Sequence, residues 1–170
     1  IYINQPSPIN FTVQTTNVTG CWYNTNGTIK VTGVSGGTGL KQVSIDGTTF
    51  YPTTYTFNVG VGSYTVYVRD ANGCIVTKPA VITGPPAIVI NTLTVTDVTC
   101  FGGNNGEVDA SASGGTGALE YSIDGINYFA SGNFTGLTAG NYTMYVRDLN
   151  GCVLTQDFTV GQPPALFFTT

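Results

Sequence analysis

Residues 137–148 read Leu-Thr-Ala-Gly-Asn-Tyr-Thr-Met-Tyr-Val-Arg-Asp, and this stretch decides the fold. From Tyr142 onward, large apolar residues alternate with residues that tolerate solvent. Successive side chains of a β-strand point to opposite faces, so Tyr142, Met144 and Val146 are expected to face a core. Thr143, Tyr145 and Arg147 would then face outward. The pattern predicts a half-buried strand.

Similar alternation on both sides of this strand predicts a small all-β domain. Six strands are expected in this part of the chain, near residues 88–98, 107–113, 119–123, 133–137, 141–148 and 152–160. The residues that lead into Tyr142 resemble the corner before the tyrosine-bearing strand of immunoglobulin-like sandwiches. The predicted fold class is therefore all-β, with an Ig-like antiparallel β-sandwich.

The same pattern occurs twice in the chain. Residues 64–70 read Tyr-Thr-Val-Tyr-Val-Arg-Asp and match residues 142–148 at every position but one, and an Asn-Gly-Cys follows close behind both segments. The offset between the copies is 79 residues at Cys21 and Cys100 but 78 at Gly36 and Gly114. A period of this kind predicts tandem domains. The missing residue, near Gly33, is expected at a strand end or a bulge.

Proline-rich segments recur once per period and mark the expected domain boundaries. They read Gln-Pro-Ser-Pro-Ile at residues 5–9, Gly-Pro-Pro-Ala-Ile at 84–88 and Gln-Pro-Pro-Ala-Leu at 162–166. We interpret them as stiff junctions, or alternatively as edge-strand starts within one fold. The expected organisation is the end of a preceding repeat at 1–8, sandwiches at 9–86 and 87–164, and the start of a next repeat at 165–170.

Two Asp-Gly pairs, Asp46-Gly47 and Asp124-Gly125, each follow an isoleucine and precede an aromatic segment. They predict tight hairpin turns that require a positive φ.

Composition argues against several functions. Charged residues make up 8% of the chain, against about 25% in ordinary soluble proteins, and the net charge is -4. Five scattered cations form no basic face, so nucleic acid is not an expected partner. Histidine is absent, and neither copy shows a convincing catalytic constellation, so we predict that the chain is not an enzyme. No apolar run is long enough to span a membrane.

Each copy contains one early and one late cysteine. A self-sufficient repeat favours Cys21 with Cys74 and Cys100 with Cys152, in an oxidising compartment. Four buried free thiols remain an alternative. A single zinc site would have to recruit ligands from both domains, so it is disfavoured.

The Asp-x-Asn-Gly segments that begin at Asp70 and Asp148 could bind a metal ion. Asp70 with Asn72, and Asp148 with Asn150, resemble the opening of a calcium loop, although the full ligand spacing is missing. A turn in which the aspartate caps its own backbone explains the same residues. Calcium is the only cofactor that the residue pattern suggests, and we expect no other.

Aromatic residues outside the predicted core could bind sugar rings. They are expected to be Trp22, Tyr23, Tyr67, Phe101 and Tyr145. Packing in the core or between domains is the alternative.

Each copy resembles the SprB-type repeat of Bacteroidota surface proteins. In the second copy the resemblance rests on Cys100, residues 114–116, 121–125 and 137–148, and the closing 150–152. The first copy departs from it, since Val43 replaces the hairpin tyrosine and residues 59–62 read Val-Gly-Val-Gly.

The resemblance implies a repeat of a long filamentous adhesin on the bacterial cell surface. It further implies export by a type IX secretion system and a possible part in gliding motility. The expected partners are neighbouring repeats of the same chain, and polysaccharide or another substratum. A carbohydrate-binding accessory module of a secreted glycan-degrading protein is the alternative function.

Overall fold

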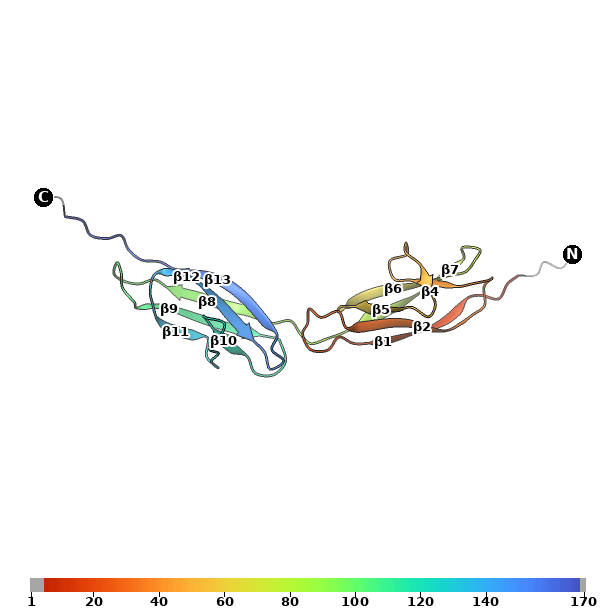
Figure 1. The fold of residues 1–170 in the computed structure, drawn as a ribbon, viewed down its shortest axis with the longest axis horizontal. Helices are drawn as coiled ribbons and strands as arrows, with labels where there is room; N and C mark the ends of the chain where they lie inside the picture. Colours follow the sequence, from red (N-terminus) through yellow and green to blue (C-terminus); the bar gives the residue numbers. More distant parts are fainter. Residues whose placement is uncertain (1–4, 169–170) are drawn as a thin grey trace. The chain divides into compact units, whose positions relative to one another are not determined.

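The chain divides into two compact units, Ile1–Pro85 and Pro86–Thr170, which we call unit 1 and unit 2. The computed structural model describes residues 5–168 (Figure 1). The strands of unit 1 are β1 (Asn10–Thr16), β2 (Gly27–Ser35), β3 (Gln42–Ser44), β4 (Tyr51–Pro52), β5 (Thr56–Val59), β6 (Gly62–Arg69) and β7 (Ile75–Ile82). The strands of unit 2 are β8 (Val89–Thr96), β9 (Gly106–Ser113), β10 (Glu120–Ser122), β11 (Asn133–Leu137), β12 (Gly140–Arg147) and β13 (Val153–Val160).

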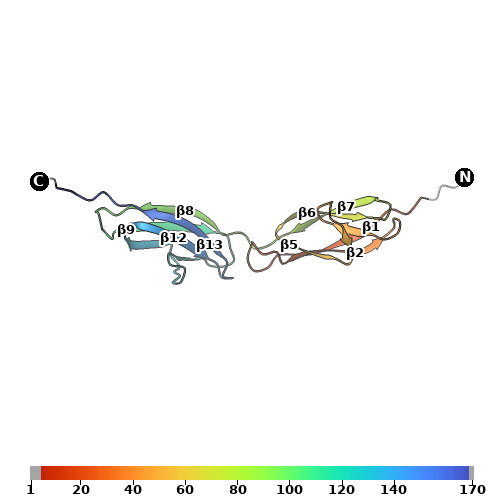
Figure 2. The same cartoon turned by 45° about the horizontal axis from the view of Figure 1, so that its top comes forward.

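Unit 1 is a sandwich of two antiparallel sheets. One sheet has the order β1-β2-β5 and the other β4-β3-β6-β7. In the turned view of Figure 2, β6 and β7 lie in one layer of this unit and β2 and β5 in the other. Strands one, two and five of the chain thus face strands three, four, six and seven, as in Ig-like sandwiches. The predicted fold class is confirmed.

Unit 2 repeats this order with one strand reduced to a bridge. Its sheets are β11-β9-β8 and β10-β12-β13. The place of β4 is taken by an isolated bridge between Tyr121 and Phe129, whose main chains exchange hydrogen bonds of 2.7 and 2.8 Å. The six predicted strands correspond to β8 through β13.

The inner faces of the two sheets form the core, as the alternation in sequence predicts. In unit 1, Ile29 and Val31 of β2 are buried in one cluster with Val66 and Val68 of β6. In unit 2, Met144 and Val146 of β12 have no exposed surface. The remaining buried apolar residues of unit 2 are Ile88, Val98, Val108, Ala110, Tyr121, Leu137, Cys152, Phe158 and Val160.

The one-residue difference between the copies lies at a bulge, as predicted. In unit 1, two steps along β1, from Asn10 to Thr12, oppose three steps along β2, from Ser35 to Thr32. The extra residue falls near Gly33, which has φ 62°. In unit 2 the extra residue lies on β8 instead, between Ile90 and Thr92. The two copies therefore have the bulge on opposite strands of the equivalent pair.

The Asp-Gly segments form wider loops than the tight hairpin that the sequence predicts. Gly47 has φ 73° and Gly125 φ 71°, so the positive φ is confirmed. The pairing of Val43 with Tyr51, however, leaves six loop residues, 45–50, after β3. Asp46 closes this loop, because its Oδ1 accepts hydrogen bonds from the main-chain N–H groups of Thr48 and Thr49.

A tyrosine corner precedes β6 and β12, in agreement with the expectation from residues 137–148. The Tyr142 hydroxyl donates a 3.0 Å hydrogen bond to the carbonyl oxygen of Thr138, and the Tyr64 hydroxyl donates a 3.1 Å bond to that of Gly60. Each bond ties the start of a central strand to the turn before it.

Removing this hydroxyl is expected to destabilise each unit modestly. Tyr142→Phe and Tyr64→Phe should each lower the free energy of unfolding by about 1 kcal/mol, the usual net contribution of one such hydrogen bond. Urea unfolding measures the loss. Tyr145→Phe is the matched control, and equal losses in the control and in Tyr142→Phe would refute a specific role for the corner.

The chain enters each unit at one end and leaves at the other. In unit 1, β1 begins after the segment 5–9, and β7 ends at Ile82, where the N–H of Val18 donates to the carbonyl oxygen of Thr83. In unit 2 the N–H of Val98 donates in the same way to Gly161. We call the end where the chain enters the upstream end and the other the downstream end.

Candidate functional site

The upstream end of each unit is built on a buried aspartate. Asp70 Oδ2 accepts a 2.9 Å hydrogen bond from the N–H of Thr38, which lies in the glycine-rich loop after β2. Its Oδ1 accepts bonds of 2.9 Å from the N–H groups of Asn72 and Cys74. One carboxylate therefore fixes two loops that are 32 residues apart in the sequence.

Asp148 does the same in unit 2. It accepts hydrogen bonds from the N–H groups of Thr116, Asn150 and Cys152, at 2.8, 3.0 and 2.9 Å. This arrangement explains why Asp and Asn-Gly-Cys recur together. The aspartate caps its own turn, which is the structural alternative to a calcium loop.

Calcium binding at Asp70, Asn72, Asp148 and Asn150 stays a prediction. Each of the two aspartates already accepts three main-chain hydrogen bonds, so its side chain has a structural role whether or not an ion binds. Within residues 5–168, no group of three or more His, Cys, Asp or Glu side chains comes together to hold a metal.

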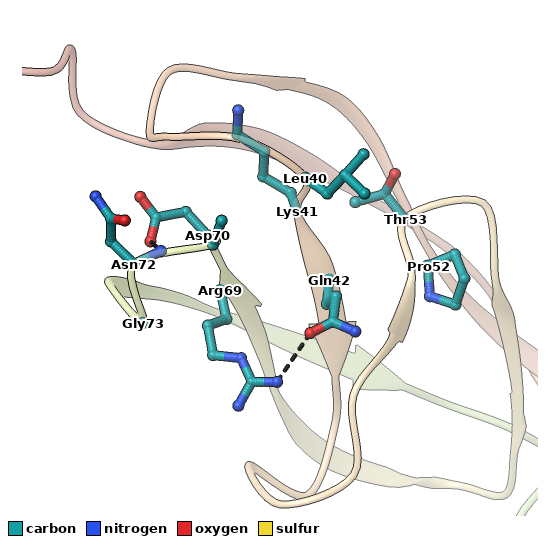
Figure 3. A pocket seen from close by; sticks show the side chains of 10 residues that line it. Leu40, Lys41, Gln42, Pro52, Thr53, Arg69, Asp70, Asn72 and Gly73 are labelled. Atoms are coloured by element: carbon teal, nitrogen blue, oxygen red, sulfur yellow. Dashed lines mark hydrogen bonds between the residues drawn. The ribbon is translucent and has the colours of Figure 1, made fainter.

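A shallow hollow lies beside Asp70 in unit 1 (Figure 3). Lys41, which directly precedes β3, and Gln42 of β3 border it with Arg69 of the neighbouring strand β6. The Arg69 guanidinium donates a 2.8 Å hydrogen bond to Gln42. In unit 2 the equivalent arginine, Arg147, forms an ion pair of 2.6 Å with Glu120. The hollow beside Asp148 in unit 2 is also lined by Glu120, Arg147 and Asn150. The arginine, aspartate and asparagine therefore recur in both copies, whereas Gln42 of unit 1 is replaced by Glu120.

Several carboxyl groups have a lowered pKa. A hydrogen bond from the Ser44 hydroxyl, with two from main-chain N–H groups, holds the pKa of Asp46 well below its usual range. Hydrogen bonds from the Asn127 side chain and from main-chain N–H groups lower the pKa of Asp124. The N–H of Thr38 is the largest cause of the lowered pKa of Asp70, and burial opposes it.

These lowered pKa values predict a loss of stability in acid. A carboxyl whose folded pKa lies below its unfolded value of about 3.9 stabilises the fold above that pH and loses this contribution as the pH falls. Thermal unfolding should therefore show a constant midpoint from about pH 7 to 5 and a falling one below about pH 4. In the double variant Asp46→Asn, Asp124→Asn, the midpoint should fall less steeply below about pH 4. If the midpoint of the double variant fell as steeply as that of the unaltered chain, these two carboxyl groups would not be the cause.

The early cysteines lie at the downstream ends. Cys21 and Cys100 follow β1 and β8, and each carbonyl oxygen accepts a main-chain hydrogen bond within its own turn, from Asn24 at 3.0 Å and from Gly103 at 2.9 Å. Cys100 borders a hollow with Phe101 and the proline-rich residues Pro163, Pro164, Ala165 and Leu166.

The late cysteines lie at the upstream ends. Cys74 and Cys152 directly precede β7 and β13. Cys74 borders a hollow whose other lining residues include Pro6, Ser7, Pro8 and Ile9.

The predicted pairing of cysteines inside each copy is wrong. Cys74 and Cys100 are free thiols, whereas Cys21 and Cys152 are disulfide-bonded. Within unit 1, the length of β7 separates Cys74 from the end that contains Cys21, which is about 26 Å for eight residues. A disulfide requires Cα atoms within about 7 Å. The alternative of four buried free thiols is also wrong, because Cys74 and Cys100 are exposed.

The five candidate aromatic residues lie in two different kinds of place. Trp22 and Tyr23 pack edge to face at the downstream end of unit 1, with ring centroids 5.0 Å apart, and Phe101 is 60% exposed at the equivalent place in unit 2. Tyr67 and Tyr145 are half-buried, because the Asp-Gly loop covers each ring at Gly47 or Gly125. In each unit the candidate aromatic residues therefore lie at two separate places.

The sequence interpretation missed the partners of the two strand arginines. The guanidinium of Arg69 lies 3.8 Å from the ring centre of Phe50, and that of Arg147 lies 3.8 Å from that of Tyr128. The sequence contained one signal of these contacts, since an aromatic residue recurs at the equivalent position of both copies, as Phe50 and as Tyr128. These contacts hold the Asp-Gly loop against the outer face of the sheet.

Residues 92–127 match the family model of the SprB repeat. This match confirms the predicted resemblance in unit 2. No curated protein matches the chain.

Several solved structures are similar to the chain in fold. Extracellular domains 3–5 of Drosophila OTK have a TM-score of 0.38 at 14% identity, over 92% of this chain and 62% of that one. A C-terminal fragment of intimin, in complex with the intimin-binding domain of its translocated receptor, has 0.38 at 17%, over 91% and 64%. Titin domains I67–I69 have 0.35 at 13%, over 91% and 65%. The chain spans less than two thirds of each, and likeness at this level carries no information on ligand or partner.

Between residues 5 and 168, the structure contains no helix of the length and apolarity that crossing a membrane requires.

Proposed function

We propose that this chain is a structural repeat of a long extracellular adhesin, in which tandem sandwiches carry a binding region away from the cell. The observation that supports this function best is the path of the chain through each unit, from the upstream end to the downstream end. A domain with its termini at opposite ends adds its full length to an array each time it is repeated. Both the first and the last strand of unit 2, β8 and β13, have eight residues, so each repeat adds at least about 26 Å.

The proline-rich junctions suit such an array. Residues 83–88 lie between β7 and β8 and belong to neither strand. Proline restricts both its own φ and the conformation of the preceding residue, so a Pro-Pro junction is stiffer than a glycine-serine linker. The neighbouring repeats of the same chain are the first partners that we propose.

The match to the SprB repeat supports a location on the outside of a bacterial cell. On the same basis we infer export by a type IX secretion system, and the array could act in gliding motility. A non-enzymatic role fits these assignments, because within residues 5–168 no constellation of catalytic side chains recurs in both units. Polysaccharide or another substratum is the expected target of the complete adhesin.

Shortening the array in the parent protein tests this function. Deleting repeats in whole periods should leave surface exposure unchanged, as measured with antibodies on intact cells, while adhesion to the substratum declines with each deletion. A deletion that breaks the period by a few residues is the control for misfolding. Adhesion that is independent of repeat number would overturn the spacer function.

A carbohydrate-binding module remains the second candidate because of one groove in unit 2. Tyr145, Asp124 and Asp157 line it together, and an aromatic ring beside carboxylates is a common arrangement in sugar recognition. A glycan array with Tyr145→Ala as the negative control tests it. Binding that Tyr145→Ala abolishes would favour this candidate, and no binding at millimolar sugar would exclude it.

Calcium is proposed only as a stiffening ion at the two Asp-x-Asn-Gly turns. Calorimetric titration after chelation decides it, with Asp148→Asn as the control. If calcium released the same heat of binding in Asp148→Asn as in the unaltered chain, the ion would bind at a place other than the turn of Asp148.

A further inference from the structure

The two units carry charges of opposite sign. The side chains of unit 1 include four cations and two carboxylates, a net charge of +2, whereas those of unit 2 include one cation and seven carboxylates, a net charge of -6. The cations of unit 1 are Lys30, Lys41, Arg69 and Lys78. Two of them, Lys41 and Arg69, line the hollow beside Asp70. The negative charge of the whole chain therefore hides one cationic unit, whose hollow attracts anions.

The guanidinium of Arg69 is held in place, but its charge is not neutralised. It lies 3.8 Å from the centre of the Phe50 ring and donates a 2.8 Å hydrogen bond to the neutral side chain of Gln42. Among the described residues the single ion pair is that of Arg147 with Glu120, in unit 2. The other N–H groups of the Arg69 guanidinium have no partner in the part of the chain that the structure describes. This fixed, half-buried fork can still donate hydrogen bonds to a carboxylate.

The aspartate in the same hollow leaves its net charge positive. Asp70 is 6% exposed, and its two oxygens accept three main-chain hydrogen bonds, so little of its charge faces solvent. Lys41 alone offsets that charge, and Arg69 adds a second cation. The side chains of Lys41 and Arg69 extend to different sides of Asp70 (Figure 3). A ligand with several acidic groups can therefore contact both cations, whereas a small anion can contact only one.

The rest of the lining suits a sugar. Leu40 is highly exposed, and together with Pro52 it offers apolar surface to the C–H face of a pyranose ring. The side-chain amide of Asn72 makes no hydrogen bond among the described residues, so it can bind a hydroxyl group. The hollow has a volume of about 720 Å³, which is in the range of small-ligand sites. Cations beside apolar and amide groups suit an acidic saccharide.

We propose that the hollow at the upstream end of unit 1 binds a carboxylated polysaccharide, in which Arg69 pairs with one uronate carboxylate and Lys41 with another. This inference rests on the proposed adhesin function, to which it adds the chemical class of the target. Unit 2 lacks the site, because Leu119 stands in place of Lys41 and the carboxylate of Glu120 occupies the arginine. Repeats of the unit 1 type therefore bind, and repeats of the unit 2 type act as spacers.

NMR titration of the whole ¹⁵N-labelled chain with tetragalacturonate tests the site. We expect the amide signals of Gln42, Arg69 and Asn72 to shift, and those of the equivalent Glu120 and Arg147 to stay. Maltotetraose, a neutral chain of the same length, should cause no shift. Monomeric galacturonate should bind at least about tenfold more weakly, because it reaches one cation at a time. Shifts confined to unit 2, equal affinity for the neutral chain or the monomer, or no shift at millimolar tetragalacturonate would overturn the proposal.

An exchange of two residues between the repeats provides matched variants. Lys41→Leu combined with Gln42→Glu gives unit 1 the pattern of unit 2, and the affinity for tetragalacturonate should fall at least about tenfold. The urea midpoint should stay in place, because the exchange introduces an ion pair that unit 2 already tolerates. The reverse exchange, Leu119→Lys with Glu120→Gln, should raise the stoichiometry from one to two. Unchanged affinity in the first variant, or a stoichiometry of one in the second, would refute the assignment to these side chains.

A sulfated oligosaccharide of the same length and charge identifies the acidic group. The carboxylate should bind more tightly, because a planar guanidinium matches two coplanar oxygens, and tighter binding of the sulfated chain would exclude uronates as the target. Affinity should also fall as NaCl is raised from about 20 to 300 mM, and an affinity independent of salt would contradict the pairing of charges. These measurements do not depend on the length of the array, so the site and the spacer function can fail separately.

Discussion

Replacing Gly114 with alanine is expected to destabilise unit 2 by more than about 3 kcal/mol, because two separate costs add. Gly114 has φ 84°, where a residue with a Cβ is strained. An added Cβ would also lie 1.9 Å from the carbonyl oxygen of Ala87. The segment that enters unit 2 rests on this loop, since the N–H of Gly115 donates to the carbonyl oxygen of Pro86 at 3.0 Å.

Gly151→Ala is the matched control for this substitution. Gly151 has a similar φ of 78°, but nothing lies within 4 Å of the added Cβ. It should cost only about 1 kcal/mol for the strained backbone. Urea unfolding of both variants separates the two costs, and equal losses would show that the close approach of the incoming chain is not kept in solution. Gly36→Ala, whose Cβ would lie 1.9 Å from the Pro8 carbonyl oxygen, should repeat the effect in unit 1.

Phe11→Ala is expected to lower the free energy of unfolding of unit 1 by about 3 to 5 kcal/mol. Phe11 is 2% exposed and is among the largest fully buried side chains, so its removal leaves a cavity between the sheets. For a unit of this size the midpoint of thermal unfolding should fall by more than about 12 °C.

The core cluster of unit 1 contains residues of that unit alone, so the transition of unit 2 should stay in place. Calorimetry would then show two separate transitions. Phe101→Ala, at a residue that is 60% exposed, should change the stability by less than about 0.5 kcal/mol. A shift of the unit 2 transition in Phe11→Ala would show that the two cores do not unfold independently.

Local patterns predicted the sandwich because they act within one or two strands. Alternation in residues 142–146 identified the buried faces of β12, and the turn before Tyr142 identified the corner. The offset between equivalent residues of the two copies changes from 79 to 78, and this change located the bulge. One additional residue in a strand pair disrupts the regular pairing, so it lies at a bulge.

The cysteine pairing failed because it depends on a count of strands. Adjacent antiparallel strands reverse direction, so an even number of strands between two loops places them at the same end, and an odd number at opposite ends. Between Cys100 and Cys152 the sequence shows four strands. The structure has a fifth traverse, the segment whose Phe129 forms a bridge with Tyr121. This short traverse has almost no alternation, yet it moves Cys152 to the other end of the unit.

The exposure of two of the candidate aromatic residues, Tyr67 and Tyr145, also depended on tertiary contacts that the sequence pattern does not show. Tyr67 and Tyr145 alternate as outward residues, and the strand pattern alone leaves them exposed. The loop that covers them is held by an arginine over an aromatic ring, which is a contact between segments far apart in the sequence. No periodicity within one strand could reveal it.

The path of each chain from one end of its unit to the other determines how far an array could stretch. The eight-residue strands β8 and β13 span about 26 Å, whereas the 78 residues of one period could be drawn out to about 270 Å once the unit unfolds. A unit that unfolds under tension would therefore release about 240 Å of chain, and the array would absorb a pull by lengthening one repeat at a time.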